Sequence, residues 1–169
     1  VIWCSDPSKV IRDAPTVGLP GDYFYSPMQL VGEWSSYDET ICSVDPSGRG
    51  TDETAAAFLS QRNGLIYLHE MSAYRDGYSD STLLDILKRC RTYGVTSLVI
   101  ETNFGDGIVG ELFKKHLINT KQHINIEEVR ANVRKEDRII DSLEPVLNQH
   151  RLIIDRGVID WDYASNKDS

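Results

Sequence analysis

Short apolar segments separated by turn residues follow one another between residues 40 and 71. Three of them, at 40–45, 54–60 and 65–71, have the length and composition of β-strands. Arg62-Asn63-Gly64 stands between the second and the third, and Asn-Gly accepts the positive φ angles that a tight turn requires. The pattern predicts three strands, of which the last two form a hairpin.

The apolar spacing then changes to that of a helix. Positions 83, 84, 87 and 90 are apolar and fall on one helical face. Ser79 stands where an N-cap residue is expected, and Gly94 is placed to end the helix. The segment from Ser79 to Gly94 is therefore predicted to be a crossover helix.

Strands and helices alternate in the second half of the chain. The same criteria predict a strand at 95–101, a helix at 107–117, a strand at 124–129, a helix at 135–148 and a final short strand at 152–154. The connections after the third strand are long enough for right-handed crossovers. This order predicts an α/β fold built on a mixed five-stranded sheet, with three antiparallel strands followed by parallel strands, flanked by helices. The first strand is expected at the centre of the sheet, parallel to the fourth.

Composition sets the domain organisation. The chain has 169 residues, 40% of them hydrophobic, which suits one globular core. Four of the six prolines fall within the first 27 residues, where no periodicity is evident. We therefore expect residues 1–38 to form a linker or N-terminal arm and residues 39–169 to form the domain.

Charge and apolar content exclude several classes of protein. The net charge of −8 argues against a dedicated nucleic-acid binder, which normally carries a surplus of lysine and arginine. No apolar run approaches the roughly 18 to 20 residues of a membrane span, and the start lacks the layout of a signal peptide. The three cysteines are widely spaced without a C-x-x-C. A soluble, cytosolic protein without a disulfide framework is expected.

Carboxylates close two of the predicted strands. Asp45 ends the first strand and Glu101 ends the fourth. If these strands are parallel neighbours, about 4.8 Å apart, both side chains could reach one pair of divalent ions. Oxygen-only ligation favours Mg²⁺ or Mn²⁺ over zinc. The alternatives are a turn-capping role for Asp45 and a buried ion pair for Glu101; for Asp52 and Asp106, beside glycine-rich turns, a structural role is at least as well supported.

Four segments carry a resemblance to a known family. They are D-P-S-G-R-G-T-D-E-T, V-I-E-T-N-F-G-D-G, E-E-V-R-A and K-E-D-R-I-I-D-S-L-E-P-V-L-N-Q-H-R-L, which occur in this order and cover most of residues 40–155. They closely resemble the C-terminal nuclease domain of the large terminase of tailed bacteriophages, particularly the short-tailed ones. The resemblance implies an RNase H-like fold.

The same resemblance implies an activity. The implied activity is that of a metal-dependent endonuclease, which cuts concatemeric double-stranded DNA at the start and end of genome packaging. The implied mechanism is two-metal hydrolysis with two Mg²⁺ or Mn²⁺ ions. Carried over by position, Asp45 and Glu101 become the catalytic metal ligands, and Asp52 an accessory ligand. The family usually takes a third carboxylate from a late helix with a His-Asp-Asp-like run, which is not found before Ser169.

The domain is accordingly expected to lack its last helix. Asp141, Asp155, Asp160 and Asp162 are weaker stand-ins for the third carboxylate. Asp141 is expected to face solvent, and the other three are expected to lie in a polar, weakly ordered tail.

Partners and location also follow from the resemblance. It implies double-stranded DNA, the terminase ATPase domain, the portal protein and the small terminase subunit as partners, in the host cytoplasm at the procapsid portal. Four basic residues are candidates for DNA contact: Arg49, Arg134, Lys135 and Arg138. The alternative for the last three is a solvated helix face that also carries Glu136 and Asp137.

Two other functions stay open. The same fold could serve as a non-catalytic docking module of the packaging motor that binds the portal or the ATPase domain. An actin-like ATPase would share the strand order and the first-strand aspartate, but the second phosphate-binding loop is not found. A P-loop motif, G-x-x-x-x-G-K-[ST], is also absent from the sequence.

Overall fold

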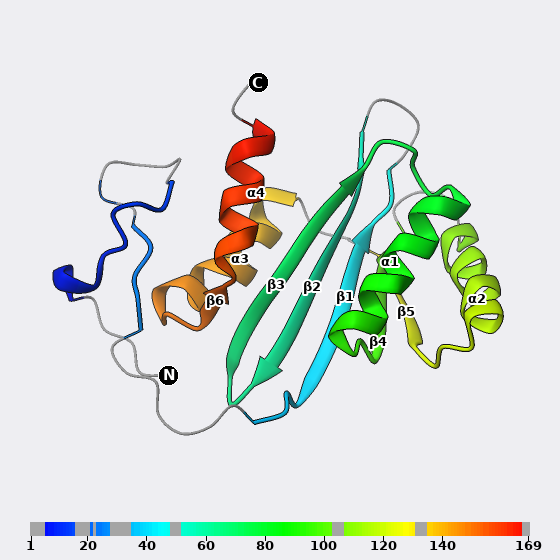
Figure 1. Cartoon of the computed structure of the whole chain (residues 1–169), viewed down its shortest axis with the longest axis horizontal. Coiled ribbons are helices and arrows are strands. Elements are labelled where there is room, and N and C mark those ends of the chain that lie inside the picture. The colour runs from blue at the N-terminus through cyan, green and yellow to red at the C-terminus, as the bar shows by residue number, and fades with distance from the viewer. Residues whose placement is uncertain are drawn as a thin grey trace.

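The structure is a computed structural model that describes residues 6–15, 21, 23–27, 35–47, 52–102, 107–130 and 135–166. Within the N-terminal stretch, Pro7–Lys9 form a short 3₁₀ helix and Val10 pairs with Tyr25 through an isolated β-bridge. The remaining elements are arranged around one β-sheet (Figure 1).

The sheet is mixed and has the order β5-β4-β1-β2-β3-β6. Its strands are β1 (Glu39–Asp45), β2 (Thr54–Arg62), β3 (Leu65–Tyr74), β4 (Ser97–Glu101), β5 (Asn125–Val129) and β6 (Leu152–Ile154). The first three strands are antiparallel, and β4 lies parallel to both β1 and β5. The predicted fold is therefore confirmed, with β1 inside the sheet. The predicted final strand at 152–154 is also present, and it pairs in parallel with β3, so the sheet has six strands and not the predicted five.

The predicted hairpin joins β2 to β3. Asn63 and Gly64 have φ angles of 49° and 76°, which the Asn-Gly pair accepts at little cost. The Asp38 carboxylate accepts a hydrogen bond of 3.1 Å from the Asn63 N–H. A bulge in this hairpin, between Phe58 and Leu59 in the register, leaves His69 as the extra residue of β3.

Four α-helices accompany the sheet: α1 (Asp80–Tyr93), α2 (Ile108–Thr120), α3 (Lys135–Asn148) and α4 (Arg156–Asn166). Ser79 caps α1 by accepting a hydrogen bond from the Thr82 N–H at 3.3 Å, and Gly94 ends the helix in the left-handed conformation. The limits predicted for this helix are confirmed.

Helix α4 replaces the polar tail that the sequence suggested. The Asp155 carboxylate accepts a hydrogen bond of 2.7 Å from the Gly157 N–H, which satisfies an amide of the first helical turn. Arg156 pairs with Asp160 one turn later at 3.1 Å. Val158 is buried, and the helix packs against β3. A cap, an ion pair and one apolar anchor thus order a segment that lacks a long apolar stripe.

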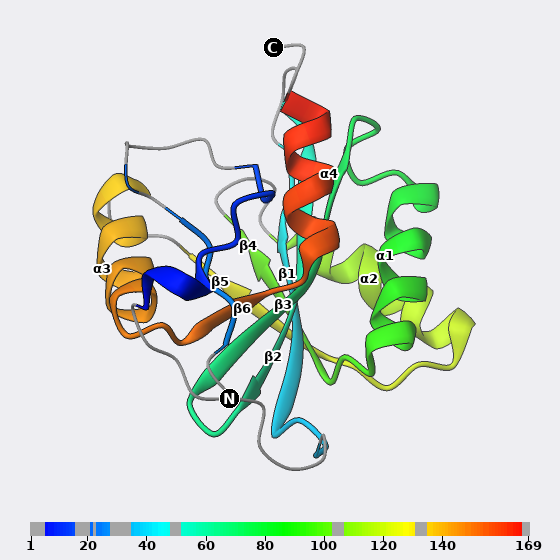
Figure 2. The same cartoon turned by 60° about the vertical axis from the view of Figure 1, so that its left-hand side comes forward.

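The core lies between the sheet and two of the helices. Figure 2 shows α1 and α2 on one side of the sheet and α3 on the other. The buried cluster joins Cys42, Val44, Ala56, Phe58, Leu98 and Ile100 from the strands to Leu83, Ile86, Leu87, Cys90, Val109, Phe113 and Leu117 from α1 and α2. Each large apolar side chain buried in this way contributes about 1.5–3 kcal/mol. Among the helices described, none is long and apolar enough to cross a bilayer.

Candidate functional site

Asp45 and Glu101 close two adjacent parallel strands at the same edge of the sheet. The register pairs Val44 of β1 with Ile100 of β4, and the next residue of each strand is the carboxylate. Neighbouring strands lie about 4.8 Å apart. The two acids therefore occupy equivalent positions in one row of the sheet.

Both carboxylates belong to the face of the sheet that α1 and α2 leave uncovered. Val44 and Ile100 are 1% and 0% exposed and point into the core beneath these helices. Successive side chains of a strand point to opposite faces, so Asp45 and Glu101 point away from that core. Asp45 is exposed and Glu101 is half-buried. The geometry brings together the two acids that the sequence singled out.

The donor set fits a hard divalent cation. The pair offers carboxylate oxygens only, the ligand type that Mg²⁺ and Mn²⁺ favour, and lacks the cysteine and histidine ligands typical of zinc. Within the described parts of the chain, no group of three or more His, Cys, Asp or Glu side chains forms a metal cluster. Asp45 and Glu101 are thus the two carboxylates that would hold such an ion.

The other candidates at this edge have separate places. Asp52 is exposed, two residues before β2 begins, and its neighbour Glu53 pairs with Arg75 at 2.9 Å. Three candidates lie outside the described residues: Arg49, Asp106 and Arg134. Lys135 and Arg138 belong to α3, but their side chains lie outside the described part as well.

The four acids considered as stand-ins for a third ligand also fall on separate elements. Asp141 is exposed on α3, as expected. Asp155 accepts the Gly157 N–H, and Asp160 pairs with Arg156. Asp162 is exposed on α4. Among the described residues, none of the four forms a metal cluster with Asp45 and Glu101.

A buried pair of hydroxyl residues next to Asp45 was missed by the sequence analysis. Thr54 Oγ1 accepts a hydrogen bond from the Ser47 N–H at 2.9 Å and donates one to Ser47 Oγ at 3.1 Å. Thr54 is 1% exposed and Ser47 is 8% exposed. The signal in the sequence was a hydroxyl residue on each side of the glycine-rich turn, but only the strand register shows that the two meet.

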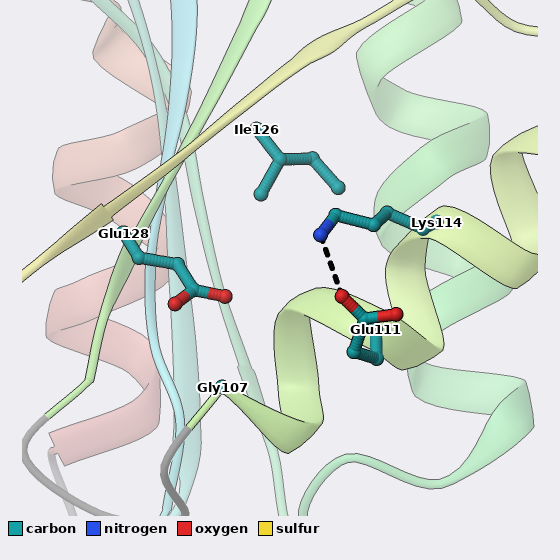
Figure 3. A pocket seen from close by; sticks show the side chains of 5 residues that line it. All are labelled: Gly107, Glu111, Lys114, Ile126 and Glu128. Atoms are coloured by element: carbon teal, nitrogen blue, oxygen red, sulfur yellow. Dashed lines mark hydrogen bonds and ion pairs between the residues drawn. The ribbon is translucent and has the colours of Figure 1, made fainter.

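A cavity of about 410 Å³ lies between α2 and β5 on the other face of the sheet. Figure 3 shows Glu128 of β5 facing Gly107 and the first turn of α2, and Lys114 paired with Glu111 at 2.6 Å. Glu111, with a smaller contribution from Glu128, raises the pKa of Lys114. Lys114 therefore keeps its proton, and neighbouring carboxylates balance its positive charge. This balance argues against binding of an anion there.

A second cavity, of about 480 Å³, lies beside β3, between α1 and the start of α4. Arg89 pairs there with Glu70 and with Asp85, and Tyr74 donates a hydrogen bond of 2.8 Å to Asp85. Burial, followed by the bond to Asp85, raises the pKa of Tyr74. These polar groups satisfy one another, as expected of a structural network.

Comparisons with known proteins agree with this architecture. Residues 44–152 match the family model described as the terminase of bacteriophage T7, ribonuclease H-like domain. The large terminase subunit of Enterobacteria phage T3 is 42% identical over 168 residues, which is 99% of this chain and 28% of that protein. The chain thus spans less than a third of the length of this relative.

Two solved structures share the fold at low identity. The human cytomegalovirus terminase nuclease domain, soaked with Mn and bound to an inhibitor, has a TM-score of 0.53 and 10% identity, covering 72% of this chain and 64% of that one. The large terminase of the thermophilic bacteriophage D6E has a TM-score of 0.50 and 14% identity, covering 73% of this chain and 30% of that one. With the family match and the T3 relative, the conclusion is that this chain belongs to the family of the ribonuclease H-like domain of T7-type large terminases.

Proposed function

We propose that this chain is a metal-dependent endonuclease domain of a phage large terminase. Its substrate would be concatemeric double-stranded DNA, cut at the start and end of packaging. The observation that carries the proposal is the equivalent placement of Asp45 and Glu101 at the ends of adjacent parallel strands, on the face that α1 and α2 leave open. Asp45 is exposed on this face, so a DNA phosphate could approach it.

In this proposal Asp45 and Glu101 hold two Mg²⁺ or Mn²⁺ ions, with Asp52 as an accessory ligand. Ions bound there would lower the pKa of an attacking water and stabilise the leaving 3′ oxygen. By holding the cations, the two carboxylates would orient the reacting phosphate, whose negative charge the cations would offset. Arg49, Arg134, Lys135 and Arg138 would contact other phosphates of the duplex.

Partners and location are proposed on the same basis. A domain of this kind would work beside the terminase ATPase domain, the portal protein and the small terminase subunit, at the procapsid portal in the host cytoplasm. DNA delivered by a motor would reach the acidic domain in spite of its net charge of −8.

Plasmid cleavage in Mn²⁺ tests the proposal. The wild-type chain, Asp45→Asn and Glu39→Gln are compared, because Glu39 is an exposed acid at the opposite end of the same strand. We expect Asp45→Asn to lose at least about 100-fold in rate, since removing a catalytic group typically costs two to four orders of magnitude. Glu39→Gln should cut like the wild type. Equal cleavage by Asp45→Asn and the wild type would reject the assignment.

One observation favours a second candidate, the non-catalytic docking module. Ile140, Leu143 and Leu147 of α3 are 55%, 45% and 52% exposed and follow one another at helical spacing. An apolar helical face of this kind is suited to burial against another part of the motor. Absence of Mn²⁺-dependent cleavage in the full-length protein, together with loss of binding to the motor when Leu143 becomes Glu, would favour docking over catalysis.

A further inference from the structure

We propose that the buried hydroxyl pair of Ser47 and Thr54 positions the Asp45 carboxylate for metal binding. The inference rests on the metal site proposed above and assigns to these two residues a role that does not involve contact with the ion. Ser47 follows Asp45 by two residues, and Thr54 immediately precedes Ala55, the register partner of Asp45. Both residues therefore lie just past Asp45, Ser47 on the segment that follows β1 and Thr54 at the start of β2.

The backbone ladder between β1 and β2 ends at Asp45. Its last registered pair is Asp45 and Ala55, and the residue after Asp45 is Pro46, which has no N–H to donate. The next amide, that of Ser47, is bonded to the Thr54 hydroxyl at 2.9 Å. A side-chain acceptor thus takes over where the backbone ladder ends, which opposes fraying at the residue that carries the carboxylate.

The Thr54 hydroxyl uses both of its hydrogen-bonding functions in this contact. It accepts from the Ser47 N–H and donates to Ser47 Oγ at 3.1 Å. Since both residues are buried, loss of the hydroxyl would leave polar groups of Ser47 without their partner in a site with little access to water. Movement of Ser47 toward water would then relieve the cost, and Asp45 would move with it.

The turn between β3 and α1 closes the third side. Gly77 has a φ of +59°, and a Cβ placed on it would lie 3.3 Å from Ser47 Oγ. The Ser47 side chain is therefore enclosed by Thr54 and Gly77, which restricts its conformations. Because the conformation of Ser47 is restricted, the direction in which the chain leaves the end of β1 is restricted as well.

Metal affinity reports the position of the carboxylate directly. Groups that orient metal ligands from outside the coordination shell typically change affinity by about 10- to 100-fold when they are removed. Thr54→Val keeps the shape of the side chain and removes the hydroxyl. We expect it to raise the Mn²⁺ concentration at half-saturation by about tenfold, near the lower end of that range, because Thr54 acts through the backbone. Thr54→Ser keeps the hydroxyl and should restore wild-type binding.

The same strand supplies a matched control. Thr40 Oγ1 and Ser60 Oγ share a hydrogen bond of 2.8 Å, and both residues are buried at the opposite end of β1. Thr40→Val removes a comparable hydrogen bond between buried hydroxyls far from Asp45. It should lower the melting temperature, by less than Thr54→Val because Ser60 Oγ keeps its bond to His69, while binding Mn²⁺ like the wild type.

The experiment is isothermal titration of the whole chain with Mn²⁺, with thermal melting of each variant alongside. Ser47→Ala, which retains the amide bond to Thr54, serves if Thr54→Val fails to fold, and a shift of at least about threefold is expected from the loss of one of the two bonds. Wild-type Mn²⁺ affinity in the folded Thr54→Val variant, or in Ser47→Ala, overturns the inference. The inference is also overturned if Thr40→Val and Thr54→Val weaken Mn²⁺ binding equally. A wild-type chain that binds no Mn²⁺ rejects the proposed metal site, and with it the positioning role.

Discussion

Asp45 and Glu101 follow directly after Val44 and Ile100, two core residues that face each other across the parallel pair β1 and β4. The burial of Val44 and Ile100 on one face dictates that the two acids share the other. Packing of an apolar row therefore positions the two acids, because a slip of one residue in either strand would point its acid into the core.

Binding of Mn²⁺ to this pair should stabilise the folded chain. A ligand present at 100 times its dissociation constant adds about 2.7 kcal/mol, because it binds the folded state and not the unfolded one. We expect the melting temperature of the wild type to rise on addition of Mn²⁺ and to fall back with EDTA. Asp45→Asn and Glu101→Gln should each lose most of this rise, whereas Glu39→Gln should keep it. An unchanged rise in both variants would place the ion elsewhere.

Much of the fold followed from local patterns in the sequence. Asn63-Gly64, the Ser79 cap and Gly94 each mark a boundary through a specific backbone requirement, and the structure has a boundary at all three. The order of strands and crossovers then left β1 and β4 as parallel neighbours. The place of Asp45 and Glu101 at one edge was predictable because both lie at strand ends.

The remaining features depend on contacts that local patterns do not show. Helix α4 is held by the Asp155 cap, the Arg156–Asp160 pair and one buried valine, a weak apolar signal in a polar segment. The pairing of Thr54 with Ser47 depends on how far the β1–β2 ladder extends. Register and packing decide both features.

The end of α1 gives a test of backbone conformation alone. Gly94 has a φ of +67°, and a Cβ built on it would meet nothing within 4 Å. Gly94→Ala should therefore lower the free energy of unfolding by about 1 kcal/mol through the left-handed conformation, without any steric clash. Gly94→Asn should cost less, since asparagine tolerates this region better. Urea denaturation measures both, and equal stability of all three proteins would contradict the argument.

His69 should make the fold sensitive to acid. Its Nε2 lies 2.8 Å from Ser60 Oγ, and its ring stacks on Tyr93 at a centroid distance of 5.4 Å. Burial lowers the pKa of His69 below the ordinary 6.5, against a smaller opposing effect of Asp155. As the pH falls, the unfolded chain takes up a proton at His69 that the folded chain resists. The contribution of neutral His69 to the free energy of unfolding is therefore present above the ordinary pKa of 6.5 and is lost as the pH falls below it.

Replacing His69 by Asn should flatten this loss between pH 7 and about 5, the range in which an unfolded histidine gains its proton. Denaturation midpoints at several pH values provide the measurement. The exposed His123 offers a control, and His123→Asn is expected to retain the acid sensitivity of the wild type. A His69→Asn protein that loses stability as steeply as the wild type would show that other groups cause the effect.

The proposed contact of Arg49 with DNA can be tested through salt. Arg49 lies outside the described residues, and in the sequence it stands four positions after Asp45. A residue that neutralises one phosphate of duplex DNA contributes about 0.9 to the slope of log affinity against log salt, because it releases condensed counterions. Arg49→Gln should reduce the slope by about that amount, with the largest loss of affinity at low salt. Lys88→Gln is the control, because Lys88 is exposed on α1, which covers the opposite face of the sheet from Asp45. The measurement is a set of DNA-binding isotherms in Ca²⁺ between about 50 and 200 mM salt, a range of about fourfold over which such slopes are resolved. Equal slopes for the wild type and both variants would show that Arg49 makes no phosphate contact.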